Sequence, residues 1–546
     1  MEVEKVLHIV ANELKNFYYQ PNLRHVDDYE LEEFAANYGI RTQHGSLAFT
    51  SNVQSSSLPL TVYVGGKDVM GKNPNSSQIR ILRELSATLT KVHHYARKVP
   101  FTCVEKKMCN NEDFNLHCTL FTSLYKKESV RLPFLWGQSL FSPQKKRALK
   151  LHLVCIPEWP AHQRQTIVFP EMGITYVLGS DYFDDIRTGF LRMAMHFAKT
   201  NGMQALYGAS KIITCYDSKE KKFKNYAAIF IGPSQIDKSV YLSDNFSLNG
   251  KGEDVRLLQD GVLFIRKYNQ VLGAEKISLV KAQGLEPHLQ PLFYRAALSR
   301  KTNFENVIID HQGRLDFQDY TITDNGKAII QITDFARSNP AYLTDVGFLS
   351  AEDINLSSIE KLDGLKIFIM TKLNSVVPPI CKLEPQQAST LFMLGESVTD
   401  NKIVREPASN PYLVGSAEEE AEGLLNFIEN NKQKVETYLI NTGSVGESPS
   451  KEVRRKRKTR PKKIETQDIL HICKAILRED IKWEKNRYWQ VLVPKTTENT
   501  NLDKYKLENF FGADDIKKAV LHLRSERQEY LKGFPKLPSC IKKTII

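Results

Sequence analysis

The stretch YAAIFIGPSQIDKSV, residues 226–240, decides the fold class because it joins a buried strand to the start of a phosphate-binding loop. The apolar run before Gly232 predicts the strand. A phosphate-binding loop has a glycine, four residues, a second glycine, and then lysine with serine or threonine. Lys238 and Ser239 are present here, but Asp237 stands where the second glycine belongs. The stretch therefore indicates a nucleotide-binding-like lobe with an altered loop.

The composition is that of a soluble globular protein with a basic excess. The chain has 546 residues, 41% hydrophobic and 25% charged, and this length predicts two lobes or more. No stretch approaches the roughly 20 apolar residues that cross a bilayer, and the start lacks a signal-peptide pattern. Eight scattered cysteines without a C-x-x-C pair indicate buried thiols in an intracellular chain that is not secreted. The formal charge of +12 favours anionic partners.

Hydrophobic periodicity predicts a mixed α/β chain. Helices are predicted within residues 1–45, 79–96, 190–202, where Gly202 suits the helix end, and 416–431, and paired strands over 166–179. Short apolar strands alternate with turns from Tyr226 onward, which favours a mixed sheet or a barrel-like lobe. The polar segment around 215–226 predicts the boundary between an N-terminal lobe, 1–222, and a C-terminal lobe, 223–546.

Eight stretches carry a resemblance to a known family. They are VLGSDYFDDIRTGF (177–190), ALYGASKII (205–213), IGPSQIDKS (231–239), LLQDG (257–261), GLEPHLQPL (284–292), FENVIIDHQGRLDFQDYTITDNGK (304–327), SVVPPICKLEPQQASTLFMLGES (375–397) and YLINTGSVGE (438–447). In order and context they resemble the ATP-dependent phosphoenolpyruvate carboxykinases, a gluconeogenesis family that converts oxaloacetate and ATP to phosphoenolpyruvate, carbon dioxide and ADP. The resemblance covers residues 165–546. It implies a two-lobed carboxykinase fold with the phosphate-binding loop in the C-terminal lobe.

The resemblance implies three ligands for an inner divalent metal, and this chain replaces all three. In the family they are an unprotonated lysine, a histidine and the second aspartate of a pair. The matching positions are Thr188, Tyr207 and Gly261, and Arg187 replaces the lysine that precedes the ligand. Threonine is a poor neutral ligand, tyrosine ionises only near a pH of about 10, and glycine has no side chain. We therefore expect no inner metal and no cofactor.

The altered loop has lost two glycines of the family sequence G-x-S-G-T-G-K-T. Gln235 and Asp237 replace them, and residues with a side chain lose roughly 1–2 kcal/mol in the left-handed geometry that lets amides converge on phosphate. The charge of Asp237 also repels polyphosphate. Two hypotheses stay open: a remnant loop in which Lys238 is solvated or paired, and a weak nucleotide or anion site.

Part of the family's binding set is retained. By the resemblance, residual nucleotide contacts would come from Gly232, Ser234, Lys238, Ser239, Glu286, Arg460 and Thr466, the last at the start of a helix. Asp260 and Ser239 would hold nucleotide-bound magnesium if that site survives. The substrate arginine is replaced by Lys327, which keeps the charge but loses the bidentate fork.

Residues 451–463, KEVRRKRKTRPKK, form a basic insertion with nine basic side chains in thirteen positions. Like charges so close repel one another, so we expect a mobile surface loop. Its cationic residues are Arg454, Arg455, Lys456, Arg457, Lys458, Arg460, Lys462 and Lys463 together with Lys451. Three uses stay open: a solubilising loop, a nuclear localisation signal, and phosphate contacts with RNA, DNA or another polyanion without base stacking.

These patterns predict a catalytically inactive, carboxykinase-like pseudoenzyme with a binding or structural role. We expect it in the cytoplasm or the nucleus, off the membrane, with a protein partner or a polyanion. The first alternative is an active ATP-dependent carboxykinase with a rebuilt site, using Lys238, Ser239, Asp260, Glu286 and Arg187 with ATP and Mg²⁺ or Mn²⁺. The second alternative is a nucleic-acid-associated factor that uses the basic insertion.

Overall fold

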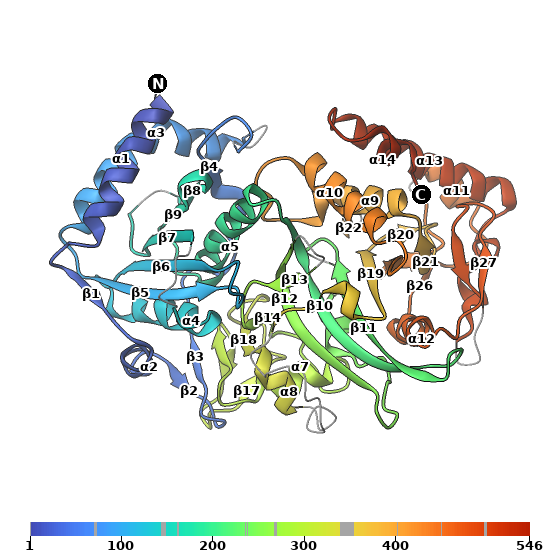
Figure 1. The fold of residues 1–546 in the computed structure, drawn as a ribbon, viewed down its shortest axis with the longest axis horizontal. Coiled ribbons are helices and arrows are strands. Elements are labelled where there is room, and N and C mark those ends of the chain that lie inside the picture. Colours follow the sequence, from blue (N-terminus) through green and yellow to red (C-terminus); the bar gives the residue numbers. More distant parts are fainter. Residues whose placement is uncertain are drawn as a thin grey trace. The chain divides into compact units, whose positions relative to one another are not determined.

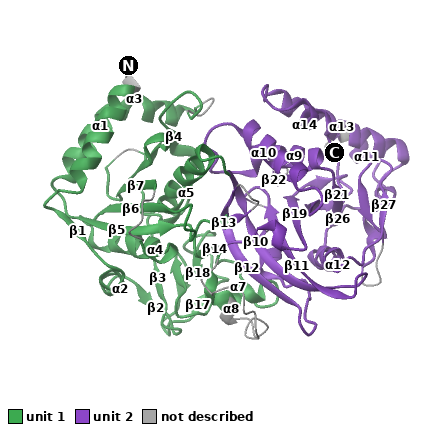
Figure 2. Cartoon of the chain, in the orientation of Figure 1, with its two compact units in different colours: residues 1–203, 272–338, 349–354 green, residues 204–271, 339–348, 355–546 purple. Residues whose placement is uncertain are grey.

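A computed structural model gives the fold of most of the chain (Figure 1). The described residues are 2–69, 74–143, 149–160, 163–234, 236, 238–266, 270–338, 354–356, 358–400, 402–448, 450–495 and 500–546. They form two compact units (Figure 2). Unit 1 comprises Met1–Met203, Leu272–Ser338 and Leu349–Ile354, and unit 2 comprises Gln204–Val271, Asn339–Phe348 and Asn355–Ile546.

The division between the units differs from the predicted boundary after residue 222. Strand β10 (Gln204–Asp217) pairs with β11 (Lys222–Ile231) on one side and with β12 (Asp254–Ile265) on the other. These two ladders tie β10 to unit 2 although it precedes the polar segment. The chain then returns to unit 1 at Leu272, a crossing for which we had no sequence signal.

Unit 1 contains a mixed sheet with helices on both faces. Within its described residues the strand order is β1-β5-β6-β7-β9-β8-β4, and the antiparallel pair β8–β9 confirms the paired strands predicted over 166–179. The strands are β1 (Leu23–His25), β4 (Thr61–Tyr63), β5 (Phe101–Met108), β6 (Leu116–Ser123), β7 (Leu149–Ile156), β8 (Gln165–Phe169) and β9 (Ile174–Leu178). Helices α1 (Glu2–Phe17) and α3 (Ser76–Ala96) cover one face, and α4 (Arg131–Ser139) and α5 (Phe183–Thr200) cover the other, with α2 (Asp28–Ala36) against α4.

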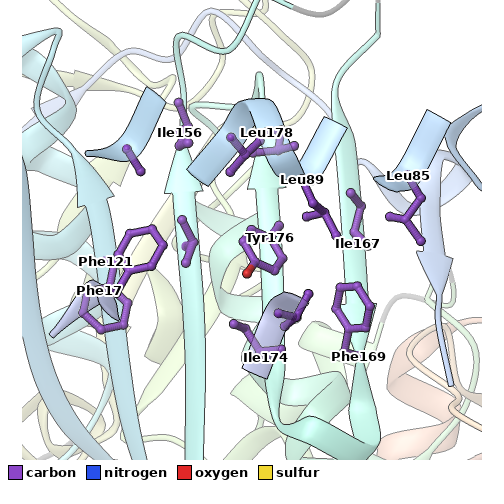
Figure 3. Close-up of a cluster of buried hydrophobic side chains, with 14 of the residues drawn as sticks. Phe17, Leu85, Leu89, Phe121, Ile156, Ile167, Phe169, Ile174, Tyr176 and Leu178 are labelled. Atoms are coloured by element: carbon purple, nitrogen blue, oxygen red, sulfur yellow. The ribbon is translucent and has the colours of Figure 1, made fainter. Parts of the chain in front are cut away.

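The core between α1, α3 and this sheet is aromatic and aliphatic (Figure 3). Leu85 and Leu89 of α3 are buried at helical spacing, which explains why the predicted helix over 79–96 forms; burying one such side chain contributes about 1.5–3 kcal/mol. Phe17 meets the Phe101 ring edge-on at 5.8 Å between centroids. The structure also confirms the end predicted for α5, because Gly202 follows it with φ +70°.

The described residues of unit 1 also form a second sheet, which is built from other strands than the first. Its order among the described residues is β14-β18-β15-β3-β2. The strands are β2 (Ile40–Arg41), β3 (Leu47–Phe49), β14 (Ile277–Lys281), β15 (Asn303–Glu305) and β18 (Lys327–Gln331), followed by the β16 (Ile308–Ile309) and β17 (Leu315–Asp316) hairpin and the helices α7 (Pro291–Ala297) and α8 (Ile332–Ser338).

Unit 2 is built on a long mixed sheet, as predicted for the segment after Tyr226. From β12 the order in the described residues is β12-β10-β11-β19-β24-β21-β28-β27. The further strands are β19 (Gly364–Thr371), β20 (Asn374–Ser375), β21 (Ile380–Leu383), β22 (Glu396–Thr399), β23 (Lys402–Arg405), β24 (Val435–Asn441), β25 (Ser444–Val445), β26 (Lys462–Lys463), β27 (Trp483–Lys485) and β28 (Leu492–Pro494). The short strand β13 (Val271–Gly273) contains the point at which the chain passes from unit 2 to unit 1. The helices are α6 (Lys238–Ser243), α9 (Pro385–Leu394), α10 (Ala417–Asn430), α11 (Lys451–Arg455), α12 (Thr466–Leu477), α13 (Ala513–Lys532) and α14 (Ser539–Lys543).

The basic insertion is exposed, as expected, but it is not an irregular loop. It begins with α11, which Ser450 caps, and ends in β26, which pairs with β25. Acidic neighbours offset part of its charge: Arg457 lies 2.8 Å from Glu447. The two ends of the insertion are therefore regular elements, α11 and β26, where local ion pairs and strand pairing counter the repulsion. Its mobility stays a prediction.

The eight cysteines are all free thiols. Cys540 is exposed and the other seven are buried, which confirms the expectation of buried thiols. Burial raises the pKa of Cys103 and of Cys215 to about 12. Of the helices that the structure describes, none is long and apolar enough to span a bilayer.

The buried ion pair between Arg527 and Glu396 should be a major contributor to the stability of unit 2. Both side chains are 0% exposed, and Arg527 Nη2 lies 2.6 Å from Glu396 Oε2. In Arg527→Leu we expect a loss of about 3 kcal/mol or more in the free energy of unfolding, because a carboxylate remains buried with fewer partners. Urea unfolding measures this loss. The matched control is Arg487→Leu, which removes an exposed pair with Glu508 and should cost less than about 1 kcal/mol; equal costs would contradict the prediction.

Candidate functional site

In unit 2 the register of β10 and β12 places two predicted positions side by side. Tyr207 pairs with Val262, Gly208 with Gly261, and Ala209 with Asp260. Because alternate residues of a strand share a face, the side chain on the Tyr207 face is that of Asp260, not position 261. A carboxylate therefore remains one residue before the predicted ligand position.

The altered loop runs from the end of β11 to the start of α6. A side-chain carbon at Gly232 would lie 2.8 Å from the Met370 carbonyl oxygen, so this first glycine is required by packing. Ser234 Oγ donates to Glu406 Oε2 at 3.2 Å. Gln235 and Asp237 lie outside the described residues, and the expectations for their backbone stay predictions.

Lys238 is turned back onto its own loop and sheet. Its Nζ donates to the Gly232 carbonyl oxygen at 3.0 Å and lies 3.8 Å from the centroid of the Tyr207 ring. The Tyr207 ring also contacts Tyr412, in a T-shaped arrangement with 5.4 Å between the ring centroids. The lysine that would clamp phosphates is thus held by a carbonyl and a cation–π contact.

Two carboxylates shape the electrostatics around Lys238. Burial lowers the pKa of its ammonium to about 8, while Asp260 and Glu406 act to raise it. Burial raises the pKa of Glu406, against the opposing effects of Ser234 and Lys238. Among the described residues, Glu406 Oε1 is buried without a hydrogen-bond partner. A carboxyl group from a distant part of unit 2 therefore already lies beside the loop and its lysine.

In unit 1 the predicted positions Arg187 and Thr188 lie on α5. Arg187 Nε donates to Glu275 at 2.9 Å and its Nη1 to Asp184 at 3.0 Å. Thr188 is buried, and its hydroxyl accepts from Arg192 Nη1 at 3.1 Å. Arg187 is thus paired with two acidic side chains of its own unit, and Thr188 bonds Arg192 of the same helix.

Lys327, at the position of the family's substrate arginine, begins β18. Its Nζ donates to Asn325 Oδ1 at 2.7 Å. Burial lowers its pKa, while Asp184 acts in the opposite direction. Lys327 and Arg187 thus share the influence of Asp184, which sequence reasoning did not single out.

The remaining predicted residues are spread over the fold. Thr466 is the first residue of α12, which confirms the predicted helix start. Arg460 is exposed in the basic insertion, Ser239 lies in the first turn of α6, and Glu286 belongs to unit 1. The structure brings together Gly232, Ser234, Lys238, Tyr207 and Asp260, and it adds Glu406, which no local pattern marked.

The residues at the predicted inner-metal positions do not fit a divalent cation. Tyr207 presents its ring to an ammonium, the Thr188 hydroxyl bonds a guanidinium, and Gly261 has no ligand atom in its side chain. A positive charge beside a metal position disfavours the metal. Of the described residues in this part of unit 2, Asp260 and Glu406 supply carboxylates near Lys238. Over the described ranges, no group of three or more His, Cys, Asp and Glu residues is arranged to hold a metal ion.

A buried strand, a glycine and a helix that begins with lysine lie on a mixed sheet, and they give unit 2 an α/β architecture. A family model described as "Phosphoenolpyruvate carboxykinase", for the ATP-dependent branch, matches residues 29–503. The chain therefore belongs to the phosphoenolpyruvate carboxykinase family, which confirms the resemblance and the predicted fold class.

Three curated relatives are named phosphoenolpyruvate carboxykinase (ATP). The chain is 25% identical to the one from Aeropyrum pernix over 369 residues, covering 66% of this chain and 67% of the relative. It is 29% identical to one from Bacillus cereus over 289 residues (50% and 47%) and 24% identical to one from Staphylococcus haemolyticus over 307 residues (54% and 51%). The chain thus aligns with about half the length of the latter two.

The lowered pKa of Lys238 predicts a pH-dependent stability. Its pKa is about 8 in the folded chain against the usual 10.5, so between these values the unfolded state binds more protons and the free energy of unfolding rises with pH. Relative to Lys238→Met, the wild type should gain about 1–3 kcal/mol from pH 8 to 10.5. Urea unfolding across this range measures the difference.

Lys432→Met, which removes an exposed lysine of unit 2, is the matched control for loss of a charge. A wild-type gain of the same size against this control as against Lys238→Met would show that Lys238 is not its source.

Proposed function

We propose that this chain is a catalytically inactive member of the phosphoenolpyruvate carboxykinase family whose retained fold serves a binding role. The observation that carries the proposal is the position of Lys238, with its ammonium 3.8 Å above the Tyr207 ring. In the family this lysine belongs to the phosphate-binding loop. Here its ammonium contacts the Tyr207 ring and the Gly232 carbonyl, both in its own unit.

Phosphate binding would have to displace these contacts. Lys238 would leave the Gly232 carbonyl and the Tyr207 ring, losing a hydrogen bond of about 0.5–1.5 kcal/mol and a cation–π contact of about 0.5–2 kcal/mol. The incoming phosphates would also meet the Glu406 carboxylate, which bonds Ser234. Together these costs weaken ATP binding by one to two orders of magnitude or more.

The charge arrangement of unit 1 supports the same proposal. In the active alternative Arg187 meets the substrate anion, but here its guanidinium is paired with Glu275 and Asp184. A substrate carboxylate would compete with two carboxylates that are already in place. Lys327 supplies a single point charge instead of a bidentate fork.

The names of the relatives favour the first alternative, an active ATP-dependent carboxykinase with a rebuilt site. That alternative uses ATP with Mg²⁺ or Mn²⁺ and retains Asp260 as a carboxylate beside Lys238. The two readings differ in one measurable quantity, the formation of phosphoenolpyruvate from oxaloacetate and ATP.

The test combines a ligand-binding and an activity measurement. We expect no shift in thermal unfolding with millimolar ATP and Mg²⁺ or Mn²⁺, where a ligand at about 100 times its Kd would add roughly 2.7 kcal/mol. We also expect no phosphoenolpyruvate above the level given by Lys238→Ala. The Aeropyrum pernix relative serves as the positive control in the same assay. Turnover of the wild type well above Lys238→Ala would overturn the proposal.

The basic insertion supports a second candidate function, the binding of a polyanion such as RNA or DNA. Arg455, Arg460 and Lys463 are exposed, and within the described part of the chain none of them has an ion-pair partner. They are therefore free to neutralise phosphates. The nuclear localisation signal, the solubilising loop and a protein partner remain proposals for the same segment.

Polyanion binding by the insertion predicts a steep salt dependence. The variant Arg455→Gln/Arg460→Gln/Lys463→Gln should bind single-stranded RNA or DNA more weakly and flatten the slope of log K against log salt by up to about 2–3, since each lost phosphate contact removes roughly 0.7–0.9. Fluorescence anisotropy measures both. The control Lys402→Gln/Lys432→Gln/Lys485→Gln removes three exposed lysines elsewhere in unit 2. Unchanged slopes in the first variant would exclude this function.

A further inference from the structure

We propose that unit 1 contains a binding site for a small, multiply charged oxyanion at one end of its second sheet. A cavity of about 520 Å³ opens there. Its lining includes Arg41, Lys276, Arg300, Lys301, Asn303 and Gln331. A volume of this size is in the range of sites for small metabolites.

The topology of the second sheet explains why these residues meet. Arg41 ends β2 and Gln331 ends β18, whereas Asn303 begins β15 and Lys276 immediately precedes β14. Because β18 runs antiparallel to both β14 and β15, these termini lie at the same end of the sheet. Four strands thus deliver polar side chains to one place, as strand ends do in many binding sites.

The charge of the cavity lining is strongly positive. Among the described lining residues, four side chains are cationic, Arg41, Lys276, Arg300 and Lys301, and one, Glu32, is acidic. In the part of the chain that is described, Arg300 and Lys301 have no ion-pair partner. Clustered cations repel one another unless an anion neutralises them, and in a concave site their field is concentrated.

Asn303 adds a hydrogen-bond donor to the cavity lining. Its residue is only 6% exposed, and its side-chain amide makes no hydrogen bond within the described residues. The amide atoms are not among the described buried polar atoms that lack a partner, so they are accessible from the cavity. An oxyanion bound there would accept a hydrogen bond from this amide.

Part of the cavity lining is apolar, and this restricts the kind of ligand that fits. Leu47, Phe134, Phe141 and Ile332 line it and are buried. The site therefore suits a small anion with two or more charged groups, either phosphate or carboxylate, and the apolar side chains would contact a carbon skeleton where the ligand has one.

This site is separate from the residues of the proposed function. All of its lining residues belong to unit 1, and Lys238, Tyr207 and the basic insertion belong to unit 2. It contains none of the positions matched to the family's metal, substrate or nucleotide residues. The two proposals can therefore fail independently.

Isothermal titration of the full chain with pyrophosphate and, in a second arm, with citrate tests the proposal. We expect saturable one-site binding of at least one of them, and at least a tenfold weaker affinity in Arg300→Gln/Lys301→Gln. Both residues are exposed, so this variant should fold. Preference for pyrophosphate or for citrate distinguishes a phosphate from a carboxylate ligand.

Two further variants make the result specific. Arg295→Gln/Lys91→Gln removes two exposed cations of unit 1 that do not line the cavity, and it should bind as the wild type does. Lys238→Ala should also bind as the wild type does. No saturable binding of either anion to the wild type, or equal affinity in Arg300→Gln/Lys301→Gln and its charge-matched control, would overturn the proposal.

Discussion

Strand β10 hydrogen-bonds to β11 along one edge and to β12 along the other, and the candidate site of unit 2 depends on this register. β11 leads directly into Gly232, and β12 carries Asp260 opposite Ala209. The strands pack so closely that a side-chain carbon at Gly208 would lie 2.6 Å from the Phe230 carbonyl oxygen. With the backbone fixed in this way, the ammonium of Lys238 lies over the ring of Tyr207 and donates to the Gly232 carbonyl. The charge of the loop lysine is therefore met by groups of unit 2.

Lys238 in unit 2 and Arg187 in unit 1 both lie beside groups of their own unit that offset their charge. In unit 2 the ammonium of Lys238 is met by an aromatic ring, a carbonyl and two nearby carboxylates; in unit 1 the guanidinium of Arg187 is met by Glu275 and Asp184. Each of these cations therefore has partners supplied by the chain. Catalysis of phosphoryl transfer instead requires cations aimed at charge on the substrate.

Local features of the fold were predictable and distant pairings were not. Three features follow from residues that are neighbours in the sequence: the buried face of α3, the strand before Gly232 and the start of α12 at Thr466. Helix α4 was missed because nearly all of its residues are buried, so it lacks the polar face that reveals a helical period. The boundary between the units, which lies before β10, was missed because it depends on the pairing of β10 with β11 and β12. The polar segment that suggested a boundary follows β10 in the sequence.

The same distinction applies to the candidate site. Glycine, lysine and serine of the loop were found from their spacing. The partner of Ser234, Glu406, lies 172 positions away, and Glu275 lies 88 positions from Arg187. Such pairs form only in the tertiary fold, so the hydrophobic periodicity of a single sequence cannot predict them. The choice between positions 260 and 261 likewise needed the strand register, because neighbouring residues point to opposite faces.

The distribution of the cysteines gives each unit its own reporter of opening. Cys103, Cys109, Cys118 and Cys155 are buried in unit 1, and Cys215, Cys381 and Cys473 are buried in unit 2. A thiol reagent applied to the folded chain should reach Cys540 first, because thiolate and access are both needed for reaction. The order in which the buried thiols become labelled under mild denaturation would then reveal which unit unfolds first.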